Sequence, residues 1–582
     1  DDDNDNDNHR VSVKILLDEN RALRPVPIIH PTESEIANSK TTTSSAEAVA
    51  RAIQGDRFGT SSNEKSSPSS SSSSLHLFRV LPPTTIGGKN WLPNPVDEIT
   101  GVFHIKIYIV DDQLVLSGAN LSREYFKDRM DRYLHLVDGA NGLVDFYAEL
   151  VEILCHHSNE YQITPPVGAT STSTSTSTST TVSNKCARQN RNSKDEFLRE
   201  ITQHFQDPNQ CSASIASAQD LFAVGDDDEK NRKIVAVGVP TFQAPVGFFR
   251  ETDGTNGDGD NDDDHDKKLT PASIARDVVA SSSTFWSLFR IDQQPPDRVN
   301  FVTDLEATLN LLKEAGKSNN SSNGNGNAAS SKDRHYTVQL SSAYLNPTTS
   351  LLSVLKEGFR NVEFLTAGRI SHGFKPKKKD CNEGSQGTDW TIPSVFDKLV
   401  DECMSFLRST TTTSASSGSD TKRTSGIDAR LFYWERPDWT FHAKGIWMTE
   451  KEENTDFVSN NKTTIEDDDT TKSGEVAAVV IGSSNFGYRS FCRDMESNLV
   501  MVFPPTDAAD SPKGSGGGDD KTVHIARSFG EEWKNLIASS KREVVETEID
   551  KDHQDQQETT AEKPPPLPWP ILKSIPYIKS FF

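Results

Sequence analysis

Residues 103–117 read FHIKIYIVDDQLVLS, and much later residues 439–448 read WTFHAKGIWM and residues 476–481 read VAAVVI. The apolar side chains of these runs alternate or continue over lengths typical of β-strands. In the first stretch Asp111 and Asp112 separate two apolar runs, which predicts a hairpin over 103–110 and 113–117. The two later runs predict a second hairpin, so the chain is expected to have two similar halves.

A histidine and a lysine occupy equivalent places in the two hairpins. Side chains two residues apart on a strand point to the same face. We therefore expect His104 and Lys106 to share one face, and His442 and Lys444 to do the same. Each returning strand ends in small residues followed by an asparagine, and small residues let an amide approach a ligand closely.

The polar residues of this repeat recur at matched offsets. The His-to-Lys step is two residues in both halves, and the Asn-to-carboxylate step is eleven, from 120 to 131 and from 485 to 496. The His-to-Asn step alone differs, 16 residues against 43, and the excess falls in the low-complexity stretch 450–475. The two sets are His104, Lys106, Asn120 and Asp131, and His442, Lys444, Asn485 and Glu496. If they face each other, two ammonium groups and two amides would balance the charge of one phosphate without a metal.

Strands and helices alternate around both hairpins. The second half predicts strands over 336–340, 361–366 and 430–434, and helices over 347–357, 392–407 and 527–539. The first half predicts strands over 9–17 and 75–81 and a helix over 142–155. This order favours an α/β fold of two pseudo-symmetric lobes, with mixed sheets flanked by helices and long disordered insertions.

Much of the 582-residue chain has too few apolar side chains to contribute to a core. Small or polar residues dominate 64–74, 170–183, 251–266, 316–332, 408–424, 450–475 and 506–521. Such segments bury too little apolar surface to offset the entropy of ordering, so we expect them to be disordered. The predicted domains are a first lobe over 9–165, a linker over 166–232, a second lobe over 233–550 and a tail over 551–582.

Charge and cysteine content narrow the function classes. The formal net charge is −23, whereas nucleic-acid binders normally carry a basic face, so no nucleic acid partner is expected. The six cysteines form no Cys-x-x-Cys pair, which indicates no structural zinc. We interpret His156 and His157, beside Cys155, as a surface pair at a helix end, because no further ligand lies at ligand spacing. We predict no metal and no cofactor.

The motifs resemble the phospholipase D superfamily. HIKIYIVD at 104–111 matches its signature, and GSSNFGYRSFCRDMESN at 482–498 resembles its second motif. More closely, SGANLSREYFKDRMDRY at 117–133, WTFHAKGIW at 439–447 and SSAYLNPTTSLL at 341–352 resemble the eukaryotic mitochondrial phosphatidylglycerophosphate synthases. There are three departures. Thr449 stands where the second signature has aspartate, and the first turn is one residue shorter than the superfamily spacing, with Asn120 nine residues after Asp111. The first lobe is also expected to lack the usual first strand and helix before His9.

The resemblance implies transfer of the phosphatidyl group from CDP-diacylglycerol to glycerol 3-phosphate, with release of CMP. It also implies a peripheral location on the mitochondrial inner membrane. His104 is expected to attack the phosphorus and His442 to protonate the leaving CMP. The lysines and asparagines would stabilise charge on the phosphate oxygens. Asp131 and Glu496 would hydrogen-bond the imidazoles, each across the interface between the lobes, while Asp111 would support local geometry.

Glycerol 3-phosphate carries a phosphate of its own, so extra cations are expected beside the motifs. The candidates are Arg123, Arg129, Arg132, Arg489 and Arg493. A phosphatidylserine synthase of the same superfamily is the alternative, followed by a phosphodiesterase. The sequence leaves open whether a phosphohistidine forms or His104 acts only as a base.

The C-terminal residues 568–582 read PWPILKSIPYIKSFF. Aromatic, aliphatic and lysine side chains in this mixture are typical of a segment at the level of lipid headgroups. The basic run KPKKK at 375–379 would add attraction to anionic lipid. We predict an interfacial contact here, and the alternative is a tail that packs onto the second lobe.

Overall fold

The computed structural model describes residues 12–27, 42–54, 73–80, 101–137, 142–161, 191–206, 236–244, 303–320, 335–375, 391–409, 427–451, 475–503 and 520–542, with Leu567 and Lys573. The predicted insertions lie mainly outside these ranges, as does nearly all of the tail. No helix among the described residues is long and apolar enough to cross a membrane.

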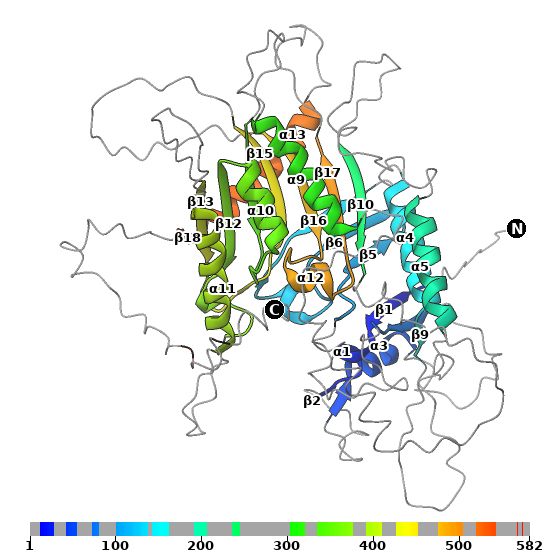
Figure 1. The fold of residues 1–582 in the computed structure, drawn as a ribbon. Helices are drawn as coiled ribbons and strands as arrows, with labels where there is room; N and C mark the ends of the chain where they lie inside the picture. Colours follow the sequence, from blue (N-terminus) through cyan, green and yellow to red (C-terminus); the bar gives the residue numbers. More distant parts are fainter. Residues whose placement is uncertain are drawn as a thin grey trace, which may run out of the picture.

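The second half is built on one eight-stranded sheet (Figure 1). In spatial order its strands are β10 (Val237–Gln243), β17 (Glu496–Val502), β16 (Val476–Gly482), β15 (Gly445–Lys451), β11 (His335–Ser341), β12 (Asn361–Ala367), β13 (Asp428–Trp434) and β18 (Ser540–Arg542). β11, β12 and β13 are parallel, and the remaining neighbours are antiparallel. The predicted mixed sheet is confirmed.

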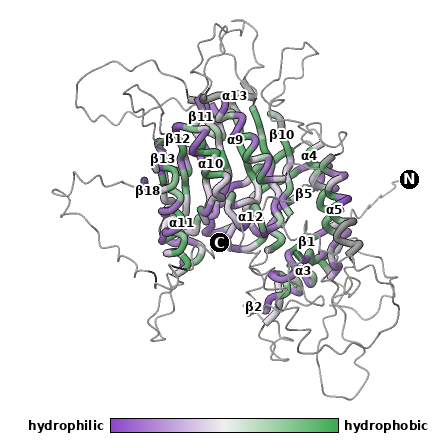
Figure 2. The backbone as a smooth tube through the Cα atoms, viewed as in Figure 1, coloured by the Kyte–Doolittle hydropathy of each residue, from purple (hydrophilic) through white to green (hydrophobic). Residues whose placement is uncertain are grey.

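Helices cover both faces of this sheet because its strands alternate apolar side chains between the two. Ile446 and Met448 of β15 are buried on the face covered by α9 (Asp304–Asn320), α10 (Thr349–Gly358) and α11 (Thr391–Arg408) (Figure 1). Trp447 lies on the other face, 5.0 Å from the ring of Trp533 in α13 (Asp520–Ala538). Hydrophobic residues accordingly run along the strands in Figure 2.

The first half contains two separate three-stranded sheets. One consists of β1 (Lys14–Asp18), β4 (Ser74–Phe78) and β9 (Asn159–Glu160), and the other of β5 (Ile107–Val110), β6 (Gln113–Ser117) and β8 (Tyr133–Leu136). The short elements α1 (Glu19–Ala22), β2 (Pro25–Pro27), β3 (Thr42–Ser44) and α3 (Ser45–Gln54) lie beside the first sheet. α4 (Leu143–His156) packs against strands of both sheets.

The two halves repeat one strand order. β1 and β4 are parallel and β9 is antiparallel to β4, as β12, β13 and β18 are arranged in the second half. β5, β6 and β8 likewise repeat the antiparallel order of β15, β16 and β17. β11 joins these two groups in the second half, and no strand takes its place among the described residues of the first. The first-half sheet is therefore divided.

The predicted linker at 166–232 is wrong in one respect. α5 (Arg191–Gln206) lies within it and packs against α4. Its Phe197 and Ile201 are buried, and the ring of Phe197 lies 5.8 Å from that of Phe78. The helix extends the first lobe past its predicted boundary. It escaped notice because polar, low-complexity sequence precedes its few apolar residues.

Candidate active site

Each His-x-Lys segment is hydrogen-bonded to the opposite half of the chain. The His104 N–H donates to the carbonyl of Met495 at 2.9 Å, and the His442 N–H donates to the carbonyl of Met130 at 2.8 Å. Each methionine directly precedes the carboxylate residue of its own half. These two matching contacts bring the repeats together at one place.

The same contacts correct the prediction that both His-Lys pairs lie within strands. β5 begins only at Ile107, and residues 442–444 separate β14 (Thr440–Phe441) from β15. The backbone here leaves its own hairpin to pair across the interface, where β14 runs parallel to β7 (Arg129–Met130). The regular strand hydrogen bonding of each hairpin is therefore interrupted at the histidine and the lysine.

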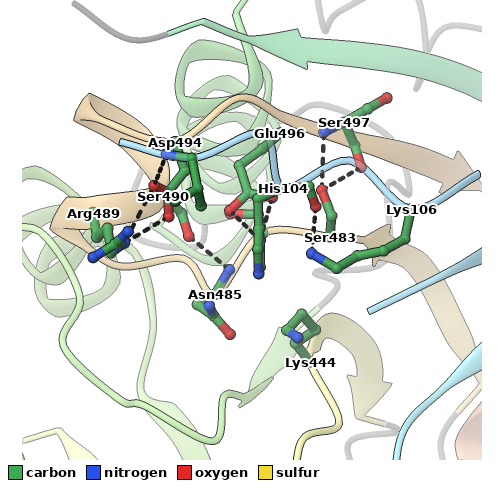
Figure 3. A network of polar contacts seen from close by, with 12 residues as sticks. His104, Lys106, Lys444, Ser483, Asn485, Arg489, Ser490, Asp494, Glu496 and Ser497 are labelled. Carbon is green, nitrogen blue, oxygen red and sulfur yellow. Dashed lines mark hydrogen bonds and ion pairs between the residues drawn. The ribbon is translucent and has the colours of Figure 1, made fainter. Parts of the chain in front are cut away.

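Each histidine is paired with the carboxyl group of the opposite half. His104 Nδ1 lies 2.9 Å from both carboxyl oxygens of Glu496 (Figure 3), and His442 Nδ1 lies 2.7 Å from Oδ2 of Asp131. All four side chains are buried. The crossed arrangement predicted from the sequence is present, and it leaves Nε2 of each ring turned away from its carboxyl partner.

Both lysines are buried beside these pairs. The Lys106 ammonium donates to the His104 carbonyl at 2.6 Å, and Lys444 Nζ lies 3.0 Å from His442 Nδ1. Burial lowers the pKa of Lys444 to about 8, against the opposing charge of Asp131. Burial likewise holds the pKa of Lys106 well below its usual range. Because desolvation disfavours the ammonium form, binding of an anion would stabilise both cations.

The two half-sites differ in their electrostatics. Burial holds the pKa values of both histidines well below the usual range, although Asp494 opposes this shift at His104 and Asp131 opposes it at His442. Burial tends to raise the pKa of Asp131, yet Lys444 and His442 outweigh it and keep that pKa lowered. The pKa of Glu496 beside His104 is raised by burial. A stable carboxylate therefore lies at His442, which is the better placed of the two to hold a proton.

The two asparagines lie beside the histidines in different ways. The Asn120 amide donates to the Tyr125 hydroxyl at 3.3 Å, and this hydroxyl lies 3.2 Å from His442 Nδ1. The Asn485 N–H donates to Ser490 Oγ at 3.0 Å (Figure 3). Asn485 Oδ1 is buried and has no hydrogen-bond partner among the described residues. An unsatisfied buried carbonyl here is suited to accept from a ligand.

A polar layer behind Glu496 was missed by sequence reasoning. The hydroxyls of Ser483 and Ser490 donate to its carboxyl group. Asn498 accepts from the Ser484 N–H at 3.2 Å and donates to Asp304 Oδ1 at 2.6 Å, so Asp304 orients the amide that holds the 482–485 turn. Asn498 was visible in the second motif, whereas Asp304 is far away in sequence and carried no local signal.

Two tyrosines beside His442 were also missed as site residues. The rings of Tyr125 and Tyr344 lie 5.3 and 6.0 Å from the His442 ring, both edge-on. Arg129 lies over Tyr125, 4.8 Å from its centroid, and hydrogen-bonds Tyr344. Of the five predicted arginines, Arg129 is the one linked to His442 through these two tyrosines.

Two other arginines are engaged in structural contacts. Arg132 donates to the Glu532 carboxylate at 2.7 Å and lies 3.9 Å above the Trp447 ring, which fastens the first half to α13. Arg489 donates to Asp494 at 2.9 Å beside α12 (Tyr488–Cys492) (Figure 3). Both guanidinium groups thus have partners within the chain, and their assignment to substrate binding stays a prediction.

The three further predicted site residues differ in their surroundings. Asp111 is exposed in the turn between β5 and β6, with a positive φ of 53°, because a two-residue hairpin turn favours that backbone. It lies at the far end of the hairpin, so its inclusion among catalytic residues is not supported. Arg123 is exposed, and Arg493 is buried with a pKa lowered to about 10 by burial.

Within the described part of the chain, two groups of His, Asp and Glu side chains have ligand atoms within 4.8 Å of one another, namely His104, Asp494 and Glu496, and His156, His157 and Glu200. The sequence showed no carboxylate near His156 and His157, but α5 brings one. Glu200 Oε2 lies 2.9 Å from His157 Nε2. In the first group the two nearby lysine cations oppose a metal ion.

Comparisons with known proteins confirm the resemblance. The chain is 22% identical over 420 residues to the probable CDP-diacylglycerol–glycerol-3-phosphate 3-phosphatidyltransferase of Dictyostelium discoideum, covering 71% of this chain and 51% of that protein. It is 23% identical over 414 residues to the mitochondrial enzyme of that name from Homo sapiens, covering 71% and 54%. The chain thus spans about half the length of these curated relatives. No family model matches it.

Two solved structures show weaker likeness. Phosphatidylserine synthase from Haemophilus influenzae is 12% identical with a TM-score of 0.41, over 91% of this chain and 74% of that one. Nuc, a phospholipase D family member from Salmonella typhimurium, is 13% identical with a TM-score of 0.19, over 40% and 90%. These scores are too low to inform the function.

Proposed function

We propose that the chain transfers the phosphatidyl group of CDP-diacylglycerol to glycerol 3-phosphate and releases CMP. The observation that carries this proposal is the pair of buried histidines, each hydrogen-bonded to the carboxyl group of the opposite half with a lysine beside it. Such a site suits nucleophilic transfer at a phosphate. The curated relatives named for this reaction support the choice of donor and acceptor.

The electrostatic difference between the half-sites supports separate roles. Burial lowers the pKa of both histidines, so the roles are assigned from their carboxyl partners, whose pKa values move in opposite directions. His104 suits the nucleophile, because burial keeps its pKa low and also raises the pKa of its partner Glu496, so that the imidazole stays neutral. His442, beside the stable carboxylate of Asp131, suits the proton carrier.

The proposed reaction has two steps. First, His104 Nε2 bonds to the phosphorus of the phosphatidyl group, the phosphorus–oxygen bond to CMP breaks, and His442 gives a proton to the departing oxygen. Second, a glycerol 3-phosphate hydroxyl gives its proton to His442 and bonds to the phosphorus, and the phosphorus–nitrogen bond breaks. Both histidines return to their starting states. Lys106, Lys444 and Asn120 stabilise the charge on the non-bridging oxygens, together with Asn485.

Arg129 is proposed to bind the phosphate of the acceptor. It lies among Tyr125, Tyr344 and His442, and its Nε is buried without a hydrogen-bond partner in the described residues. A guanidinium group matches a phosphate in both charge and geometry. The residue therefore favours glycerol 3-phosphate over serine as acceptor.

The lipid donor requires a membrane surface, so we propose a peripheral membrane protein. The relatives from Homo sapiens and Mus musculus are named as mitochondrial. On that basis this chain is proposed to act on the mitochondrial inner membrane.

Product identification tests the proposal. The purified full chain is given labelled CDP-diacylglycerol in mixed micelles with glycerol 3-phosphate, with serine or with neither, and the lipid product is identified by mass spectrometry. We expect phosphatidylglycerophosphate with the first acceptor, and none from a His104→Ala variant. Phosphatidylserine, or phosphatidic acid irrespective of acceptor, would refute the assignment. Acid-labile label on the protein after rapid quenching would distinguish a phosphohistidine from direct transfer.

A further inference from the structure

Exposed large apolar side chains gather on two loops from different halves of the chain. Leu121 and Phe126 are 59% and 75% exposed in the first half, and Ile370 and Phe374 are 44% and 48% exposed in the second. Scattered single exposures need no explanation, but apolar groups gathered beside a functional site commonly mark an interaction surface.

Both loops are in contact with the candidate active site. Phe126 follows Tyr125, whose hydroxyl lies 3.2 Å from His442 Nδ1. The Phe374 ring lies 5.3 Å from that of Tyr344, the second tyrosine beside His442. Phe126 and Phe374 therefore each adjoin a tyrosine that lies beside His442, Phe126 along the chain and Phe374 by ring contact.

The two loops also lie next to each other. A Cβ added at Gly373 would lie 2.3 Å from the Tyr344 hydroxyl and 3.0 Å from the Arg129 guanidinium. Arg129 belongs to β7, which packs against the 3-10 helix η3 (Arg123–Phe126), and β14 joins β7 to η7 (Arg369–Ser371). The exposed residues of both halves therefore belong to one continuous region.

The second-half loop packs against α11. The Phe374 ring stacks on Phe396 of α11, with centroids 6.4 Å apart and planes 6° from parallel. Leu567 packs into the same cluster, with Val395 and Leu399. Leu567 and Phe374 thus contact the same apolar cluster on α11.

Cationic side chains accompany the apolar ones. Arg123 and Lys127 are exposed on either side of Phe126 along the chain. Lys375 follows Phe374, and its ammonium donates to the Trp439 carbonyl at 3.2 Å. Apolar side chains beside cations suit the boundary between acyl chains and anionic headgroups.

We infer that Leu121, Phe126, Ile370 and Phe374 form a surface, here called the lipid-facing loops, that enters the headgroup region of a bilayer. This rests on the proposed function, because a donor with two acyl chains must be reached from the membrane. It assigns the contact to a surface next to His442, so that the donor phosphate passes from the headgroup level to the histidines over a short distance.

Vesicle sedimentation of the full chain tests the inference without any substrate. Phe126→Ser combined with Ile370→Ser removes two exposed side chains that have no catalytic role. Val110→Ser combined with Val137→Ser is a matched control, since these residues are 69% and 48% exposed and lie away from the loops. With phosphatidylcholine vesicles containing anionic lipid, we expect at least a tenfold loss of binding for the first variant and less than a twofold change for the control.

Equal binding by the two variants would overturn the inference and assign the contact to another surface, such as 568–582. Circular dichroism melting checks that both variants fold. A donor with short acyl chains, used below its micellar concentration, separates this inference from the proposed function. The loop variant should use it as the unsubstituted chain does. If neither uses it, the proposed function fails, while the vesicle result still decides the membrane surface.

Discussion

Replacing Asp131 by Asn should disable the proton carrier while preserving the shape of the site. Asp131 Oδ2 lies 2.7 Å from His442 Nδ1, and its Oδ1 accepts from the Arg132 N–H at 2.8 Å. An asparagine fills the same space but carries no charge. Its amide also presents a donor to Nδ1, which would move the imidazole proton to Nε2 and reverse the ring's tautomer.

The magnitude follows from the lost charged hydrogen bond. A hydrogen bond to a buried charged group contributes about 1.5–3 kcal/mol. If this stabilisation is needed mainly when His442 carries its proton, kcat should fall by about 10- to 150-fold, since 1.36 kcal/mol is a factor of ten in rate. A reversed tautomer would add to that loss.

The variant should also respond differently to pH. Asp131 raises the pKa of Lys444, which burial otherwise lowers and which stands at about 8. Without Asp131 this pKa falls, so the ammonium loses its proton at a lower pH. Turnover that needs the Lys444 cation is then lost below pH 8 in the variant, while the unsubstituted chain retains it up to about 8. The turnover rate of the unsubstituted chain divided by that of Asp131→Asn should rise as pH increases from 6 to 8.

The assay is initial-rate formation of phosphatidylglycerophosphate across that pH range. Asp111→Asn is the control, because Asp111 is exposed in a hairpin turn of the same half, and its rate should stay within about twofold. The reasoning is refuted if Asp131→Asn turns over as fast as Asp111→Asn, or if its deficit does not change with pH.

Other perturbations test the remaining parts of the site. Burial raises the pKa of Asp304 to about 6, so the stability that its protonated form contributes is fully present below pH 3.8 and is lost as pH rises through 6. Over that range the melting temperature of the unsubstituted chain should fall relative to that of Asp304→Asn. Melting temperatures that stay parallel would contradict this. Arg129→Ala should raise KM for glycerol 3-phosphate more than KM for CDP-diacylglycerol, and equal changes would count against acceptor binding. Arg132→Ala should lower the free energy of unfolding in urea by about 1.5–3 kcal/mol, because it removes the charged hydrogen bonds to Glu532 and the contact with the Trp447 ring, although Trp447 Nε1 still donates to Glu532. A chelator should leave turnover largely unchanged, because lysines and asparagines hold the phosphate, and loss restored by one divalent ion would oppose that view.

The repeat carried most of what the sequence could predict about the site. Equal steps from His104 to Lys106 and from Asn120 to Asp131 recurred in the second half, and equal steps imply equal geometry. Two equivalent units then pack most simply face to face, which led to the crossed pairing of Asp131 with His442. Periodic apolar residues similarly predicted the bounds of β11 to β13 and of α11 closely. Burial on one face imposes a two-residue period on a strand and a 3.6-residue period on a helix.

The remaining parts of the site depend on contacts that leave no period. His104 is held outside a regular strand by the carbonyl of Met495, and only the assembled halves define that bond. Asp304 reaches the site from α9, which carried no motif, and Tyr344 lies within the quoted stretch 341–352 but outside the matched offsets of the repeat. Neither side chain was therefore marked as a site residue. Arg132 shows the converse, since its position beside Asp131 suggested substrate binding while Glu532, 400 residues away, determines its contact.

The exchange of backbone hydrogen bonds between the halves makes them mutually dependent. His104 finds the partners of its N–H and of its ring in the second half of the chain. His442 finds both of its partners in the first half. Neither half therefore contains even a weakened version of the whole site. A substitution that weakens the interface between the halves therefore deprives both histidines of their partners at once, although it contacts neither. Selection for catalysis is here also selection for the contact between the two halves.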